Sequence, residues 1–123
     1  MCPNNLSKSE CAENINAVRD ALYVLNGKWK LLVIISLSEG PKRYKEIERS
    51  IEGITPKVLS KELRDLELNN FVERKVYDEI PVRVMYKLTP YSSSLKKIIK
   101  SLTDWGKEHR KHIMKKDKAV ALA

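Results

Sequence analysis

The sequence contains few cysteines and few glycines, and each shortage excludes a class of protein. Its two cysteines, Cys2 and Cys11, are too few for a disulfide scaffold, so we expect a reducing, cytoplasmic compartment. Four glycines leave little room for a glycine-rich phosphate loop, and the sequence has no nucleophile elbow and no HExxH zinc motif. We therefore expect neither an enzyme nor a bound cofactor.

Long apolar runs are also missing. The longest, Leu31–Ile35, has five residues, whereas a membrane-spanning helix needs about 20. The first eleven residues lack the apolar segment of a secretory signal. His109 and His112 lie three residues apart without a further clear metal ligand. The sequence thus predicts no membrane insertion and no metal site.

Positive charge is abundant. The 123 residues include 24 Lys and Arg against 16 Asp and Glu, which gives a formal net charge of +8 and a pI of about 9.5. This balance favours a polyanionic partner, whether nucleic acid, an anionic membrane surface or an acidic protein. Between Lys96 and Lys118 the excess is nine bases against three acids, and we interpret that segment as a solvated helix face.

Turn residues divide the chain into segments with distinct periodicity. Residues 1–13 are polar and aperiodic, which predicts a flexible arm. Apolar spacings of three and four, ended by glycine or asparagine, predict helices over residues 15–25, 28–38, 44–51 and 56–68. The second is apolar on nearly every side and is expected at the centre of a single domain. Thr55 is expected to cap the fourth helix, with Pro56 at its first position.

Two β-rich segments follow the four helices. Residues 71–77 and 83–88 alternate between apolar and polar side chains and flank a turn with Pro81, which predicts an antiparallel hairpin.

A last helix over residues 91–114 would be about 36 Å long, so we expect its far end to pack on a second copy of the chain. Residues 116–123 are expected to fray. The predicted fold is mainly α with a small β-hairpin: a winged helix-turn-helix over residues 14–115, with extra terminal helices.

The fourth predicted helix has two opposite faces. At about 100° per residue, Leu59, Leu63 and Leu66 form an apolar stripe. The opposite face carries Lys57, Ser60, Lys61 and Arg64, and a helix-turn-helix places such a face in the major groove of DNA. Acidic residues lie toward its flanks, where they are expected to pair with neighbours. An ordinary solvated surface is the alternative interpretation.

Further basic residues precede and follow this helix, at the start of the third helix and around the hairpin tip. Both positions suit contacts to the DNA backbone, and an arginine in the hairpin also suits the minor groove. The candidate DNA contacts are Lys42, Arg43, Lys45, Thr55, Lys57, Ser60, Lys61, Arg64, Arg74, Lys75 and Arg83.

Several motifs together resemble the HxlR family of bacterial transcriptional regulators, relatives of the MarR-type winged helices. They are "GKWK" (Gly27–Lys30), "GPKRYKEIE" (Gly40–Glu48), "ITPKVLSKELRDLE" (Ile54–Glu67), "FVERKVY" (Phe71–Tyr77), "PVRVMYKLT" (Pro81–Thr89) and "DWG" (Asp104–Gly106). The resemblance implies a homodimer joined through the first and last helices, with each fourth helix in the major groove of a palindromic site. On this basis the expected dimerisation residues are Val18, Leu22, Leu95, Ile98, Leu102 and Trp105.

The resemblance also implies that a chemical signal controls DNA binding. Some members of the family sense oxidants through a cysteine ahead of the first helix, which makes Cys11 the candidate redox sensor. Cys11 is followed by Ala12 instead of proline, and Glu10 and Glu13 disfavour a thiolate there. Whether a small-molecule effector binds is left open by the sequence. The alternative function is a winged-helix interaction module that docks on an acidic protein without specific DNA binding.

Overall fold

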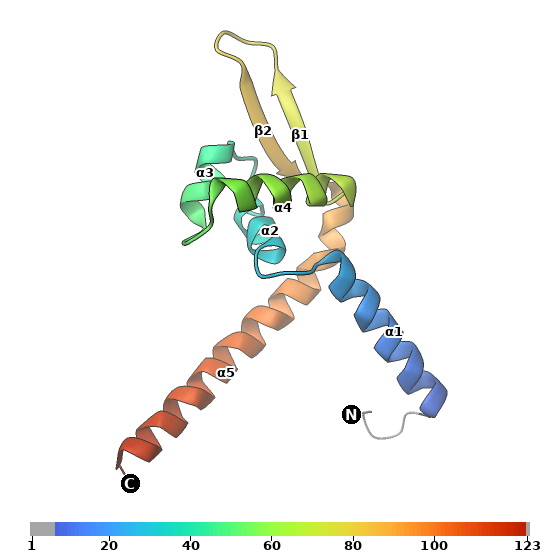
Figure 1. Ribbon diagram of the computed structural model, residues 1–123, viewed down its shortest axis with the longest axis vertical. Coiled ribbons are helices and arrows are strands. Elements are labelled where there is room, and N and C mark those ends of the chain that lie inside the picture. The colour runs from blue at the N-terminus through green and yellow to red at the C-terminus, as the bar shows by residue number, and fades with distance from the viewer. Residues whose placement is uncertain (1–6, 123) are drawn as a thin grey trace.

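The structure is a computed structural model that describes residues 7–122, and the side chains as far as residue 116. It is a winged helix-turn-helix with additional helices at both ends (Figure 1). The elements follow the predicted order: α1 (Lys8–Val24), α2 (Lys30–Leu37), α3 (Tyr44–Ser50), α4 (Pro56–Leu68), β1 (Val72–Tyr77), β2 (Arg83–Leu88), a 3-10 helix η1 (Pro90–Leu95) and α5 (Lys96–Leu122).

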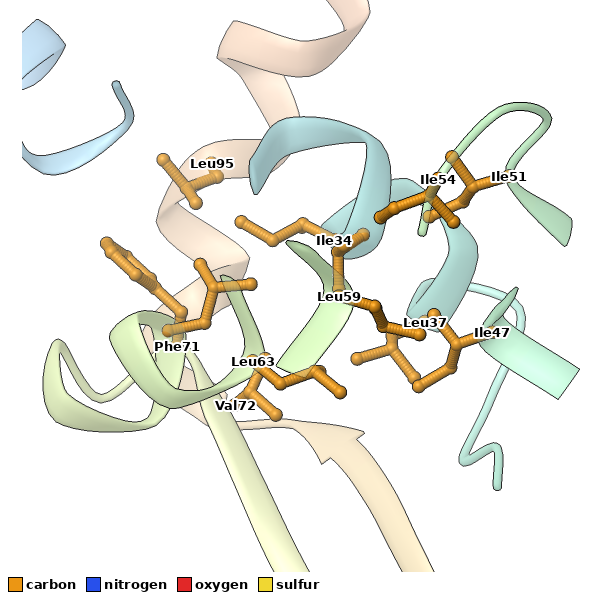
Figure 2. Packing of buried hydrophobic residues seen from close by; sticks show 12 residues of the cluster. Ile34, Leu37, Ile47, Ile51, Ile54, Leu59, Leu63, Phe71, Val72 and Leu95 are labelled. Carbon is orange, nitrogen blue, oxygen red and sulfur yellow. The ribbon is translucent and has the colours of Figure 1, made fainter. Parts of the chain in front are cut away.

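The hydrophobic core forms around α2, as its apolar composition predicts. Val33, Ile34 and Leu37 of α2 are at most 2% exposed. They pack against side chains of α3, the following turn, α4, the base of β1 and η1 (Figure 2). The other buried members of this cluster are Ile47, Ile51, Ile54, Leu59, Leu63, Leu66, Phe71, Val72 and Leu95.

The turn between α3 and α4 fixes where α4 begins. Gly53 has a φ of 86°, a left-handed conformation that suits glycine because it has no Cβ. Ile54 then turns back into the core, and Thr55 caps α4 by accepting a hydrogen bond from the Val58 N–H at 3.3 Å. Pro56 stands at the first helical position, where its missing N–H leaves no partner unsatisfied. The predicted start of α4 is therefore confirmed.

The hairpin is the wing of the fold. Strands β1 and β2 pair antiparallel, from Val72 opposite Leu88 to Tyr77 opposite Arg83. A single further bridge joins Lys42 to Tyr86, with backbone N···O distances of 2.9 and 2.8 Å. This bridge ties the segment ahead of α3 to the wing, so helix and hairpin are held on one frame.

The terminal helices are longer than the sequence suggested. Ser7 accepts a hydrogen bond from the Glu10 N–H while the Glu10 carboxylate accepts one from the Ser7 N–H, and this capping box starts α1 at Lys8. The expected arm over residues 1–13 is therefore wrong from residue 8 onward. Likewise, α5 continues through most of the expected frayed tail to Leu122. Both helices leave the compact part of the chain on the side opposite the wing and diverge (Figure 1).

Candidate nucleic-acid interface

Helix α4 presents the face that its periodicity predicts. Leu59, Leu63 and Leu66 are 0%, 2% and 1% exposed and pack on α2 and its neighbours. On the other side, the side chains that we expected to face DNA are all exposed: Lys57, Ser60, Lys61 and Arg64. The helix lies across the foot of the wing (Figure 1). Its polar face is thus free to enter a groove, as a helix-turn-helix requires.

A tyrosine of α3 clamps the first turn of α4. The Tyr44 hydroxyl donates to the Pro56 carbonyl oxygen at 2.6 Å and lies 3.0 Å from the Ser60 Oγ. The ring of Tyr44 is half-buried and packs against the core. Tyr44 belongs to α3 and its hydroxyl bonds to two residues of α4, so this side chain fixes how α4 lies against α3.

A buried lysine anchors the middle of α4. The Lys30 Nζ lies 2.7 Å from the Glu62 carboxylate, 3.2 Å from that of Asp65 and 3.0 Å from the Asn26 Oδ1. The Lys30 side chain is 3% exposed and that of Glu62 is 9% exposed. Asn26 in turn donates to the Tyr23 carbonyl in α1 at 3.1 Å. The ammonium group therefore connects the end of α1 with α4 through the interior.

Acidic residues pair with one of the expected DNA contacts itself. Lys61 lies 2.9 Å from Asp65 and 3.7 Å from Glu62. The hydrogen bond from Lys61, followed by that from Lys30, lowers the pKa of Asp65, and the same bond to Asp65 raises the pKa of Lys61. Lys61 therefore stays protonated, but its charge is partly offset by Asp65 and Glu62. The acids pair with a neighbour as expected, and this neighbour is itself a candidate DNA contact.

The three basic residues at the start of α3 differ in their surroundings. Arg43 is exposed, and the Lys45 side chain is 72% exposed and 3.6 Å from Glu48. Lys42 instead points inward: its side chain is 14% exposed, and its Nζ lies 3.1 Å from Ser36 and 3.4 Å from Glu39. Lys42 therefore stabilises the fold through these contacts. We expected its side chain to face DNA, and instead it is largely buried.

A recess of about 610 Å³ lies between α3 and the wing and adds one residue to the basic set. Its lining includes Arg43, Lys45 and Arg49, together with Val82 and Val84 of the hairpin segment. Arg49 was missed in the sequence because it stands at the far end of a short helix. Arg49 lies four residues after Lys45 on α3, and this spacing places the two cations on one side of the helix.

The cations of the wing differ in their partners. Arg74 and Lys75 are exposed on β1, and the Lys75 Nζ lies 5.5 Å from the centre of the Tyr77 ring. The Arg83 guanidinium lies 4.2 Å from the centre of the Tyr77 ring and 3.3 Å from the Glu79 carboxylate. This stacking and pairing hold Arg83 within the wing, so it stabilises the hairpin and is less available to DNA than we expected.

Apolar side chains remain uncovered on the terminal helices. Val18 and Leu22 of α1 are 56% and 63% exposed, and Leu102 and Trp105 of α5 are 50% and 65% exposed. Ile98 is 44% exposed and completes the α5 stripe. One of the expected dimerisation residues is wrong, because Leu95 is a core residue with 5% exposure. It ends the 3-10 helix η1, whose tighter winding breaks the helical phase assumed from the sequence.

Two further candidate residues, Cys11 and His109, lie on the terminal helices. Cys11 is 8% exposed, lies near the start of α1 and is disulfide-bonded, whereas the cysteine count led us to expect reduced cysteines. His109 stacks on Trp105 with a centroid distance of 4.7 Å. Among residues 7–122, no group of three or more possible metal ligands is found. No helix in that part of the chain is both long and apolar enough to span a bilayer.

Comparison with known proteins relates this geometry to regulators of transcription. The family model described as HxlR-like helix-turn-helix matches residues 24–114. An uncharacterized HTH-type transcriptional regulator of Methanothermobacter thermautotrophicus is 40% identical over 100 residues, which cover 81% of this chain and 76% of that protein. The HTH-type transcriptional regulator YodB of Bacillus subtilis is 38% identical over 89 residues, covering 72% and 80% of the two chains.

A solved structure agrees with these relatives. The redox regulator HypR in its reduced form superimposes with a TM-score of 0.74 at 33% identity, over 80% of this chain and 98% of that one.

Proposed function

Because the chain belongs to the HxlR-like helix-turn-helix family of transcriptional regulators, we propose that it binds a palindromic operator as a homodimer. The observation that carries this proposal is the exposed polar face of α4, which Lys30 and Tyr44 brace from behind. A braced helix meets a base edge with little loss of conformational freedom, and this favours specific recognition. Arg64 is the residue we assign to a base edge, since arginine pairs bidentately with guanine.

Phosphate contacts follow from the cations on either side of α4. Arg43 caps α3, Lys45 and Arg49 lie on it, and Arg74 and Lys75 lie on the wing. Contacts to the backbone fix register without reading sequence. We therefore assign the two flanking groups to the sugar-phosphate backbone and the α4 face to the bases.

The terminal helices support a homodimer. Their exposed apolar residues stand on helices that project away from the core and diverge, so one chain leaves them uncovered (Figure 1). A second copy that packs its own α1 and α5 there buries both faces through a two-fold axis. A two-fold dimer presents two α4 helices, which matches a palindromic operator with half-sites about one helical turn apart.

A protein-interaction module is the alternative, and it predicts a different dependence on salt. Binding to DNA through several phosphates falls linearly in a double-logarithmic plot of affinity against salt concentration. Docking on an acidic protein does not need the base-facing residues of α4. The family and the braced α4 face both favour the regulator.

The assignment of Arg64 is tested by an alanine substitution. Arg64→Ala is expected to lower operator affinity by about 1–3 kcal/mol while affinity for unrelated DNA changes little. Arg110→Ala is the matched control, since it removes the same charge from an exposed position on α5. The measurement is fluorescence anisotropy on operator and scrambled duplexes. An equal loss on both duplexes would move Arg64 to the backbone-contact class.

A redox signal is a second proposal, and it rests on relatives. HypR is described as a redox regulator with oxidised and reduced structures, and YodB has reduced and diamide-treated structures. Because Cys11 is disulfide-bonded in this structure, we propose that a change in the redox state of this disulfide alters DNA binding. Its place near the start of α1, a helix assigned to the dimer, lets a change there alter the distance between the two α4 helices.

A further inference from the structure

The direction of one hydrogen bond at the start of α4 is set by chemistry. The Tyr44 hydroxyl oxygen and the Pro56 carbonyl oxygen are 2.6 Å apart. Two oxygens approach this closely only with a proton between them, and a carbonyl oxygen has none to give. The proton therefore belongs to Tyr44 and points at Pro56.

This direction determines the state of the neighbouring serine. The Ser60 Oγ lies 3.0 Å from the same Tyr44 oxygen. Since the proton of Tyr44 is already committed, the hydrogen bond between the two hydroxyls must be donated by Ser60. A serine hydroxyl has one proton and two acceptor lone pairs. With its proton turned toward α3, Ser60 offers only acceptor capacity on the exposed side of α4.

We propose that Tyr44 fixes Ser60 as a hydrogen-bond acceptor, so that Ser60 binds the exocyclic amino group of an adenine or a cytosine in the operator. In the major groove adenine and cytosine present exocyclic amino donors, whereas guanine and thymine present only acceptors to a side chain. An acceptor facing an acceptor repels. Ser60 stands one helical turn before Arg64 on the same face, so both are placed to reach bases of one half-site. This inference rests on the proposed operator binding and deepens it.

The test uses an operator selected from a random duplex pool and every single-base variant of one half-site. Affinities are measured by anisotropy for the wild type and for Ser60→Ala. The position that loses its preference in Ser60→Ala is the one that Ser60 reads. Every base pair presents one such amino group in the major groove, so at that position the group is removed, with purine in place of adenine or an unsubstituted pyrimidinone in place of cytosine. The removal is expected to weaken wild-type binding about threefold to tenfold, the range of one neutral hydrogen bond, and to leave Ser60→Ala unchanged. Wild-type binding that does not depend on the amino group would overturn the inference.

Tyr44→Phe tests the tyrosine itself. The substitution keeps the packed ring and releases the Ser60 proton, which then turns toward a guanine or thymine acceptor. Discrimination at the Ser60 position is expected to fall while preferences elsewhere in the half-site persist. Tyr91→Phe is the matched control, since the exposed Tyr91 belongs to η1 and stacks on Phe71 with a centroid distance of 5.2 Å. Unchanged discrimination in Tyr44→Phe would refute the role of Tyr44.

The outcomes separate this inference from the proposed function. If the wild type binds the selected operator specifically but Ser60→Ala weakens all duplexes equally, Ser60 contacts phosphate and the inference fails alone. If no duplex is preferred over a scrambled one, operator binding fails and this inference fails with it.

Discussion

Replacing Lys30 by methionine removes the cation that anchors α4 while keeping most of the side-chain volume. Lys30 Nζ meets two carboxylates and an amide oxygen at 2.7, 3.2 and 3.0 Å. The Glu62 side chain is 9% exposed, so it would lose its closest partner in a position that water barely reaches. Breaking a buried pair in this way costs about 3–5 kcal/mol. A domain of this size is stabilised by about 5–15 kcal/mol, so a large share of the total is expected to vanish.

The assay is urea unfolding followed by circular dichroism at one fixed protein concentration, because dimer stability depends on concentration. Lys45→Met is the matched control: its side chain is 72% exposed and pairs with Glu48 at 3.6 Å, so a loss below about 1 kcal/mol is expected. The double variant Lys30→Met/Glu62→Leu removes both charges and should recover much of the loss. If Lys30→Met costs no more than Lys45→Met, the argument that a buried ion pair anchors α4 is wrong.

Three further predictions concern the dimer, pH and redox state. Leu102→Asp puts a charge in the apolar stripe of α5 and is expected to halve the mass in sedimentation equilibrium, whereas Lys100→Asp on the other side of α5 should not; an unchanged mass for Leu102→Asp would remove the proposed interface. The folded pKa of Asp65 is lowered by Lys61, so its stabilisation is present above the unfolded pKa near 3.8 and is lost as pH falls through the folded pKa. Asp65→Asn should flatten unfolding free energy against pH below about 4; an unaltered profile would contradict this. Cys11→Ser should abolish any difference in operator affinity between reducing and oxidising buffer, and a difference that survives would exclude Cys11.

The order of elements could be predicted because local chemistry marks their ends. Pro56 and Thr55 define the start of α4, and the predicted strand over residues 83–88 coincides with β2. Helix α2 is apolar on nearly every side, and this correctly predicted its place at the centre of the core. The capping box at Ser7 and Glu10 was present in the sequence and was overlooked, which misplaced the start of α1.

The supports of α4 could not be predicted because they join distant parts of the chain. Lys30 and Glu62 are 32 residues apart and appear as ordinary charges in the sequence. Tyr44 shares the apolar spacing of α3, and its hydroxyl reaches Pro56 only once the turn has formed. The inward path of Lys42 likewise depends on the bridge to Tyr86. Charge alone identifies a basic surface, whereas folding decides which cations remain on it.

The function of the α4 face is tested most directly by the affinity of the purified protein for the DNA that flanks its own gene. Anisotropy is measured beside a scrambled duplex of equal length across a salt series. The proposed function predicts tighter binding to the flanking DNA, one dimer per duplex, and a linear fall of log affinity with log salt. Equal affinity for the two duplexes at every salt concentration would contradict sequence-specific recognition by α4.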